Sequence, residues 1–191
     1  MLMKSKRILM RSLRRSDAKA VFSAIDASRA QLDQFMIWSP STRSVKDTVN
    51  FIHRTFSERR RFVTLGFGIF DAETKAYIGN ISLLNLRLDI RSAEIGYWIR
   101  SDRAGQGLAT ESSALTLRFA FEEWKAHRVI LRAASDNPGS NRVAEKLGFH
   151  LDGIQRHEQL LSRGWLDLNC YSLLEEEYRA LREQIGSFIT K

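Results

Sequence analysis

Apolar residues recur at helical spacing in the first third of the chain. They do so over residues 18–35, after a Ser-Asp pair that suits a helix N-cap, and the sequence WSP at 38–40 predicts the end of that helix. A capping sequence at 44–47 precedes a second apolar stripe at 49–56, which predicts a second helix. Ahead of both, residues 7–13 are predicted to form a strand.

The remainder of the chain carries strand patterns that glycines interrupt. Of the 11 glycines, the first is Gly66, and all but one lie between it and Gly164. Strands are predicted at 62–70, 76–84, 93–100, 128–134, 150–160 and 165–173, and helices from 108 to 124, at 138–147 and at 174–185.

Length and composition indicate one ordinary globular domain over residues 1–191. Hydrophobic residues make up 43% of the 191 positions and charged residues 27%. The 11 Phe and 4 Trp exclude a disordered chain, and no apolar run is long enough for a membrane span. A single cysteine, Cys170, excludes an internal disulfide framework, and we expect a cytoplasmic protein.

The chain is basic, with 30 Lys+Arg, 22 Asp+Glu and a formal net charge of +8. This charge indicates either acidic partners, such as polyphosphates, acidic proteins or nucleic acid, or a basic solvated surface. No helix-turn-helix, zinc-finger or aromatic-basic sequence accompanies it, so we expect no direct nucleic-acid binding. The 4 histidines lack metal-ligand spacing, which predicts no metal site, and no G-x-S-x-G hydrolase motif occurs.

The loop after the predicted strand at 93–100 has the composition of an anion site. Its sequence, RAGQGLAT at 103–110, has two glycines one residue apart, which permit a tight turn with consecutive exposed N–H groups. The following helix N-terminus adds free donors and a partial positive charge, which suits a pyrophosphate; a plain strand-to-helix turn is the alternative. The absence of a Gly-Lys dipeptide excludes a P-loop, and Glu111 breaks the dinucleotide-binding fingerprint.

A second polar block, DNPGSN at 136–141, follows the predicted strand at 128–134. Its Asn and Ser side chains can cap the next helix, or they can bind amide groups of a ligand that lies at the strand ends. That helix is predicted to stop at Gly148, which together with Phe149 suits a left-handed C-terminal cap.

The two blocks together resemble a known family. The strand AEIGYWI, the loop RAGQGLAT and the later DNPGSNRVAEKLGF are similar to the GNAT superfamily of N-acetyltransferases. The opening ILMRSLRRSDA, the phrase YIGNISLLN and the tail GFHLDGIQR resemble its RimJ/RimL type, the ribosomal-protein N-terminal acetyltransferases. The resemblance covers nearly the whole chain. It implies one α/β domain with a mixed, mostly antiparallel sheet, helices on both faces and a central strand pair that splays near residues 97–99.

The resemblance also implies that acetyl-CoA is the co-substrate. The residues it assigns to acetyl-CoA lie in the strand backbone, in the glycine loop and in the second polar block. They are Tyr97, Trp98, Ile99, Gly105, Gln106, Gly107, Leu108, Ala109, Thr110, Asn137 and Asn141.

Two catalytic residues and one acceptor contact follow from the same resemblance. Glu94 matches a strand glutamate that is the general base in some members, and Arg132 stands where other members keep a base. Ser140 matches a serine of the RimL type and replaces the usual tyrosine acid, whose position is Ala144 here. Trp38 lies where the family forms its acceptor groove. The structural alternatives are a salt-bridged carboxylate for Glu94, a helix cap for Ser140 and a core or interface aromatic for Trp38.

The resemblance implies acetyl transfer from acetyl-CoA to a primary amine by direct attack on the thioester. Its RimJ/RimL type favours a protein N-terminal α-amine, which titrates near ~7.7–8.0 and therefore loses its proton more easily than a lysine, near ~10.4. Two alternatives stay open: a small-molecule amine acetyltransferase with a narrow, closed groove at residues 35–45 and 156–166, and a non-catalytic acyl-CoA or nucleic-acid binding module. The resemblance leaves a homodimer open as the assembly.

Overall fold

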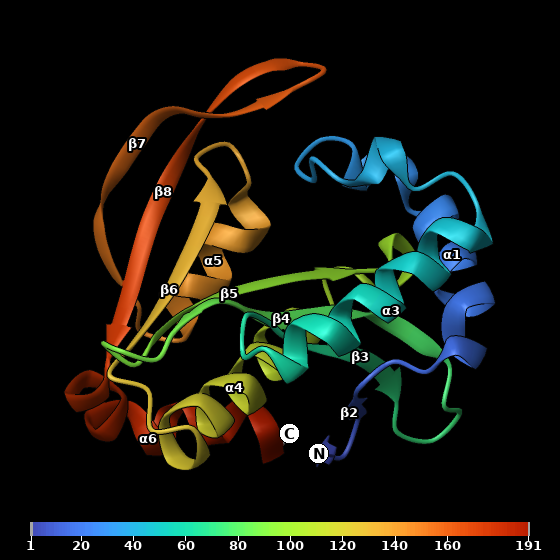
Figure 1. The fold of residues 1–191 in the computed structure, drawn as a ribbon. Coiled ribbons are helices and arrows are strands. Elements are labelled where there is room, and N and C mark those ends of the chain that lie inside the picture. Colours follow the sequence, from blue (N-terminus) through green and yellow to red (C-terminus); the bar gives the residue numbers. More distant parts are fainter. Residues whose placement is uncertain (1, 191) are drawn as a thin grey trace.

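The computed structural model describes residues 2–190 and contains an eight-stranded mixed sheet with helices on both faces (Figure 1). The strands follow the order β1-β2-β3-β4-β5-β6-β8-β7, and only the β5–β6 pair is parallel. The strands are β1 (Leu2–Lys4), β2 (Ile8–Arg11), β3 (Leu65–Asp71), β4 (Tyr77–Arg87), β5 (Ser92–Ile99), β6 (Arg128–Ala134), β7 (His150–Leu161) and β8 (Gly164–Leu174). The α-helices are α1 (Ala18–Ala27), α2 (Arg29–Leu32), α3 (Val45–Arg60), α4 (Leu108–Arg118), α5 (Pro138–Lys146) and α6 (Glu175–Thr190).

The sheet separates two hydrophobic cores. Helices α1 and α3 pack on one face, where Val21, Ile25 and Ile52 meet Phe70 and Tyr77 of the sheet. Helices α4, α5 and α6 cover the other face, and their apolar residues join the larger core (Figure 1). The predicted mixed, mostly antiparallel sheet with helices on both faces is therefore confirmed. None of the helices in residues 2–190 has the length and hydropathy needed to cross a membrane.

The central strands β5 and β6 pair over only part of their length. Their register runs from Ser92 opposite Arg128 to Ile95 opposite Leu131, and no pairing follows. Beyond that point β5 stays with β4 as far as Ile99, while β6 stays with β8. The predicted splay is thus confirmed, and it leaves backbone groups of β5 and β6 free to face a ligand.

Several element boundaries differ from the sequence prediction. The predicted helix at 18–35 breaks at Ser28, whose hydroxyl accepts a hydrogen bond of 3.0 Å from the Ser101 N–H. The predicted strand at 62–70 begins later, at Leu65, because α3 continues to Arg60 and Phe62 takes a positive φ of 53°. Strand β1, at Leu2–Lys4, was not predicted, whereas the predicted strand at 7–13 corresponds to β2. These boundaries depend on tertiary contacts that local spacing does not contain.

Candidate active site

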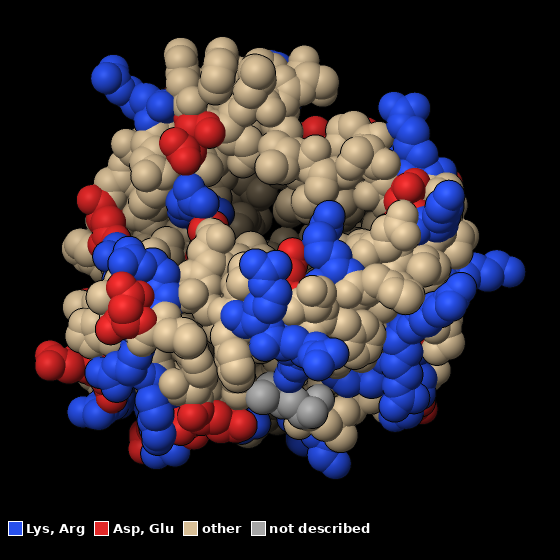
Figure 2. All heavy atoms as spheres, in the orientation of Figure 1, with Lys and Arg blue, Asp and Glu red and all other residues tan. Residues whose placement is uncertain are grey.

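Two adjoining cavities lie where β5 and β6 diverge. The larger cavity, of about 570 Å³, lies among β4, β5, β6 and the segment from α2 to α3. The loop cavity, of about 280 Å³, lies among the end of β5, the glycine loop and α5. Figure 2 shows the molecule hollowed between α5 and the segment that joins α1 to α3. Tyr97, Trp98, Asn137 and Ser140 line both cavities, so the two meet at the splay.

The glycine loop has the backbone conformation of an anion site. Gly105 and Gly107 have φ values of +75° and +77°, in the left-handed region that favours glycine. The Glu111 N–H donates to the Gly107 carbonyl at 3.0 Å, so the first helical N–H groups of α4, at residues 108–110, have no partner within the helix. Residues 103–105 and 107–110 line the loop cavity. This arrangement offers hydrogen-bond donors and the positive helix end to a phosphate.

Cationic side chains of α5 add to the positive potential of the loop cavity. Arg142 and Lys146 line the cavity one helical turn apart, and both are exposed. Neither side chain forms an ion pair or a hydrogen bond with any other part of residues 2–190. Arg103 also lines the cavity, but its Nη2 lies 3.0 Å from Oδ2 of Asp71. Two uncompensated cations beside free N–H groups suit a ligand with several phosphates.

The Ser140 hydroxyl lies at the junction of the two cavities. Its Oγ is 3.0 Å from the Tyr97 hydroxyl, and burial raises the pKa of Tyr97 to about 12 while this hydrogen bond opposes the shift. Tyr97 is therefore protonated at neutral pH and able to donate. The N-cap of α5 is Asn137, whose Oδ1 accepts from the Ser140 N–H at 3.1 Å. The hydroxyl of Ser140 thus does not cap the helix.

Asn141 does not line either cavity, and its expected contact with acetyl-CoA stays a prediction. Asn141 is 8% exposed, and its Nδ2 donates to backbone carbonyls that include Ala134 at 2.9 Å and Asn137 at 2.7 Å. Its Oδ1 accepts from Asn169 Nδ2 and the Tyr171 hydroxyl, both at 2.9 Å. With every polar atom partnered inside the protein, Asn141 fixes the turn at the end of β6.

Gln106 also points away from the loop cavity. Its carbonyl accepts from Arg7 at 3.0 Å, and its side-chain amide donates to the Asp102 carbonyl at 3.5 Å. It does not line the loop cavity as its neighbours Gly105 and Gly107 do. The expected contact of the Gln106 N–H with acetyl-CoA stays a prediction.

Glu94 lies in the larger cavity as one member of a charged cluster. Arg132 Nε and Nη2 donate to its two oxygens at 3.1 and 2.9 Å, and Asn85 Nδ2 lies 3.3 Å from Oε2. Arg132 Nη1 also reaches Glu158 Oε1 at 3.2 Å. The hydrogen bonds that Arg132 donates to Glu94 are the largest of the causes that raise the pKa of Arg132. The parallel register places Ile130 opposite Glu94, so Arg132, two residues on, faces the same cavity.

Aromatic side chains form the wall of the larger cavity opposite this cluster. Trp38 is half-buried, with its ring centroid 6.0 Å from that of Trp98. Trp98 in turn lies 5.9 Å from the ring of Tyr77. All three line the larger cavity. Trp38 is therefore both a packing residue and part of the cavity surface.

One side of the larger cavity is formed by a contact between the two segments, 35–45 and 156–166, at which the acceptor groove is expected. Phe35 packs against Leu161, Leu166 and Leu168 of the β7–β8 hairpin. Gln159 Nε2 donates to the Phe35 carbonyl at 2.8 Å, which joins the hairpin to the segment that follows α2. No local motif marks this contact, because it links residues more than a hundred positions apart.

Fold and site together define an enzyme that binds a phosphate-bearing cosubstrate at a splayed strand pair. The chain belongs to the acetyltransferase (GNAT) domain family, whose family model matches residues 7–150. It is an acetyl-CoA-dependent N-acetyltransferase of this family.

Individual relatives span nearly the whole chain. "Probable N-acetyltransferase YjcK" of Bacillus subtilis is 31% identical over 178 residues, which cover 92% of this chain and 98% of the relative. "Ribosomal-protein-serine acetyltransferase" of Escherichia coli is 25% identical, over 88% of this chain and 93% of the relative. The solved structure of RimL, a ribosomal L7/L12 α-N-protein acetyltransferase in complex with coenzyme A, superposes with a TM-score of 0.87 at 21% identity. The superposition covers 93% of this chain and 99% of the RimL chain, and it shows the same fold.

Proposed function

We propose that this enzyme transfers the acetyl group of acetyl-CoA to the N-terminal α-amine of a protein. The observation that carries the choice of acceptor is the engagement of Glu94 by Arg132. Each oxygen of this carboxylate already accepts a hydrogen bond from the guanidinium, at 3.1 and 2.9 Å. A base whose two oxygens are already hydrogen-bonded suits an amine that is partly neutral at physiological pH. An α-amine, near ~7.7–8.0, meets that condition, and a lysine near ~10.4 does not.

Acetyl-CoA would lie across the splay with its phosphates at the loop cavity. The free N–H groups from Gly107 to Thr110 would bind the diphosphate, assisted by the positive end of α4. The backbone of β5 at Tyr97, Trp98 and Ile99 would pair with the pantetheine arm along the edge that faces β6, because β6 no longer pairs with β5 there. Asn137 lines both cavities, and its Nδ2 would bind an amide carbonyl of the same arm.

The reaction needs few groups from the protein. The neutral amine attacks the thioester carbon from the larger cavity, and Glu94, directly or through water, takes the proton that the amine loses. Free N–H groups of β5 near Trp98 and Ile99 stabilise the negative charge on the carbonyl oxygen. The carbon–sulfur bond then breaks, and the thiolate takes the proton of the Ser140 hydroxyl. The Tyr97 hydroxyl, 3.0 Å away, passes its proton to Ser140 and regains one from solvent.

The names of the relatives support a protein acceptor, and one contact favours a second candidate. Relatives include enzymes named for ribosomal proteins. The carboxylate of Glu158, 43% exposed in the cluster, would attract the ammonium form of the acceptor before it loses its proton. Against this, the contact of Phe35 with the β7–β8 hairpin joins the two sides of the larger cavity, which favours a small-molecule amine.

A panel of acceptors tests the proposal by thiol release from acetyl-CoA. The panel contains peptides with free Ala or Ser N-termini, the same peptides with blocked N-termini, lysine peptides, polyamines and aminoglycosides. We expect turnover with the free N-termini and none with their blocked forms. Turnover restricted to polyamines or aminoglycosides would establish the second candidate. Turnover restricted to the lysine peptides would contradict the argument from Glu94.

A further inference from the structure

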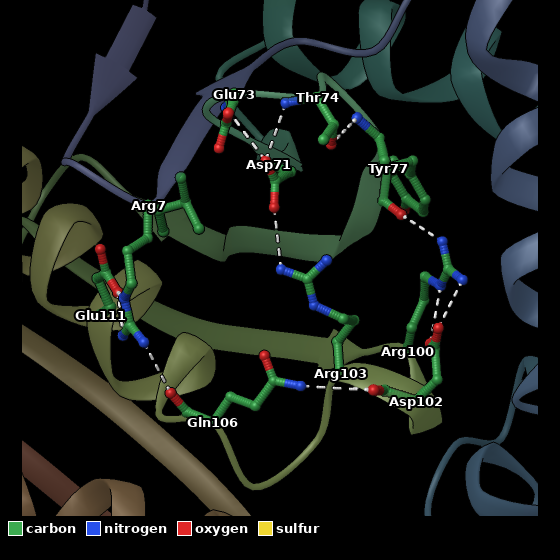
Figure 3. A network of polar contacts seen from close by, with 12 residues as sticks. Arg7, Asp71, Glu73, Thr74, Tyr77, Arg100, Asp102, Arg103, Gln106 and Glu111 are labelled. Atoms are coloured by element: carbon green, nitrogen blue, oxygen red, sulfur yellow. Dashed lines mark hydrogen bonds and ion pairs between the residues drawn. The ribbon is translucent and has the colours of Figure 1, made fainter.

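A buried carboxylate lies one turn inside the helix end that would bind the diphosphate. Glu111, in the first turn of α4, has a side chain that is 1% exposed. Its Oε2 accepts a hydrogen bond of 2.7 Å from Arg7 Nε and another from Nη2, and its Oε1 accepts from the Ser5 hydroxyl. Ser5 and Arg7 belong to the turn between β1 and β2, so the N-terminal segment supplies every partner of this carboxylate (Figure 3).

Arg7 also holds the glycine loop itself. Its Nη1 donates to the Gln106 carbonyl at 3.0 Å, and a Cβ placed on Gly107 would lie 3.8 Å from its Nη2. In a planar trans peptide the carbonyl oxygen and the next N–H point in opposite directions. The bond that draws the Gln106 carbonyl outward to Arg7 therefore turns the Gly107 N–H toward the opposite side. Gly107 lines the loop cavity and Gln106 does not, which agrees with this orientation.

The charge of Arg7 matters as much as its hydrogen bonds. A diphosphate at the start of α4 would bring a second anion to the helix end that already holds Glu111. Two anions there repel each other strongly, because a buried carboxylate is poorly screened by solvent. The guanidinium of Arg7 neutralises Glu111 and leaves the helix end and the free N–H groups to the ligand.

The turn that carries Arg7 is itself fixed beside the loop. The Ala72 N–H donates to the Arg7 carbonyl at 2.9 Å, and the adjacent Asp71 binds Arg103 of the loop at 3.0 Å. The Thr74 N–H and the Arg103 guanidinium are among the contacts that hold the pKa of Asp71 well below its usual range. Figure 3 shows Asp71 in contact with Arg103 of the loop, and Arg7 in contact with the carbonyl of Gln106.

We propose that Arg7 is a positioning residue for the diphosphate of acetyl-CoA. It aims the Gly107 N–H at the ligand and neutralises Glu111, and it does both without touching the ligand. This inference rests on the proposed function, which places the diphosphate at the glycine loop.

Calorimetric titration of CoA into the full-length protein tests the proposal without any acceptor. Arg7→Met is expected to weaken CoA binding about 30-fold, since it removes charged hydrogen bonds and leaves a buried carboxylate unpaired. Glu111→Gln is expected to leave CoA binding within about 2-fold of the wild type, because Arg7 keeps its bond to the Gln106 carbonyl and the repulsive charge is gone. The double variant Arg7→Met/Glu111→Gln is expected to bind CoA more tightly than Arg7→Met, because the repulsive charge is gone. Lys6→Met removes an exposed charge from the same turn and serves as the matched control.

Kinetics separate positioning from a general loss of structure. With Arg7→Met the KM for acetyl-CoA should rise while kcat stays within about 2-fold of the wild type, because the reacting groups are untouched. The kcat/KM for S-acetylpantetheine, which lacks the diphosphate, should be the same in Arg7→Met and the wild type. Equal loss with both thioesters would overturn the proposal, as would a double variant that binds CoA no better than Arg7→Met. If the wild-type protein does not bind CoA, the proposed function is wrong. If the wild-type protein binds CoA and Arg7→Met binds it equally well, only the role of Arg7 is wrong.

Discussion

The loop cavity and the larger cavity lie side by side but are built in different ways. The loop cavity takes most of its chemistry from one contiguous stretch, residues 103–110, in which the first helical N–H groups of α4 have no partner within the helix. The larger cavity takes its chemistry from side chains, and these come from α3, β4, β5, β6 and β7 and from the segment after α2. A phosphate site therefore needs a particular local backbone, whereas an acceptor site needs strands and helices brought into register.

This difference explains why the cosubstrate is identified more readily than the acceptor. A glycine loop followed by a helix offers the same anion-binding N–H groups wherever it occurs, because these groups belong to the backbone. Side chains such as Trp38, Glu94 and Glu158 can change without disturbing that backbone. Family membership consequently establishes acetyl-CoA, and acceptor identity is a matter for experiment.

The largest expected effect comes from the larger cavity and separates chemistry from binding. Glu94→Gln should lower kcat about 100-fold, as for loss of a general base, while CoA affinity stays unchanged. Steady-state kinetics and calorimetry on the same preparation check this. Glu158→Gln, which alters the other carboxylate bound to Arg132, should raise the acceptor KM with little change in kcat. An unaltered kcat in Glu94→Gln would remove Glu94 from the mechanism.

A backbone change in the loop cavity should have the opposite effect, which is weaker CoA binding with little change in kcat. Gly107→Ala is expected to weaken CoA binding about 10-fold, because φ is +77° and the left-handed conformation is costly for alanine. The matched control is Gly164→Ala in the β7–β8 turn, where φ is +110° and a Cβ would meet nothing within 4 Å. It imposes strain far from the loop, so CoA affinity should not change. Equal effects of the two variants on CoA affinity would refute the assignment of the loop.

A substitution in the aromatic wall of the larger cavity should change only the KM for the acceptor. Trp38→Ala is expected to raise the acceptor KM about 5-fold, through loss of apolar contact area, and to leave the KM for acetyl-CoA unchanged. Trp38→Phe, which keeps an aromatic ring beside Trp98, should recover most of the loss. A rise of similar size in both KM values would show that Trp38 maintains the shape of both cavities and does not contact the acceptor.

The smallest expected effect concerns the exposed cations of α5. Lys146→Gln should weaken CoA binding about 3-fold at low salt, and the difference should vanish at high salt because solvent ions screen exposed charges. Lys19→Gln on α1, also exposed, provides the control. A salt-independent loss would indicate a direct hydrogen bond from Lys146 to the ligand.

The sequence alone placed the glycine loop and most of the helices and strands, because a turn, a cap and an amphipathic face are properties of neighbouring residues. The fold class and the splay of the central strands followed from the resemblance of the two motif blocks to the family. The left-handed glycines at 105 and 107 and the free start of α4 followed from the letters RAGQGLAT.

The tertiary structure decided which side chains meet. It paired Arg7 with Glu111 across 104 positions, placed Arg132 between Glu94 and Glu158, and buried Asn141 under Asn169 and Tyr171. None of these contacts follows from local spacing, because each depends on the register and twist with which distant strands and helices pack. A residue type in a motif says what a side chain is able to do, and its packed neighbours decide whether it faces a ligand or another residue.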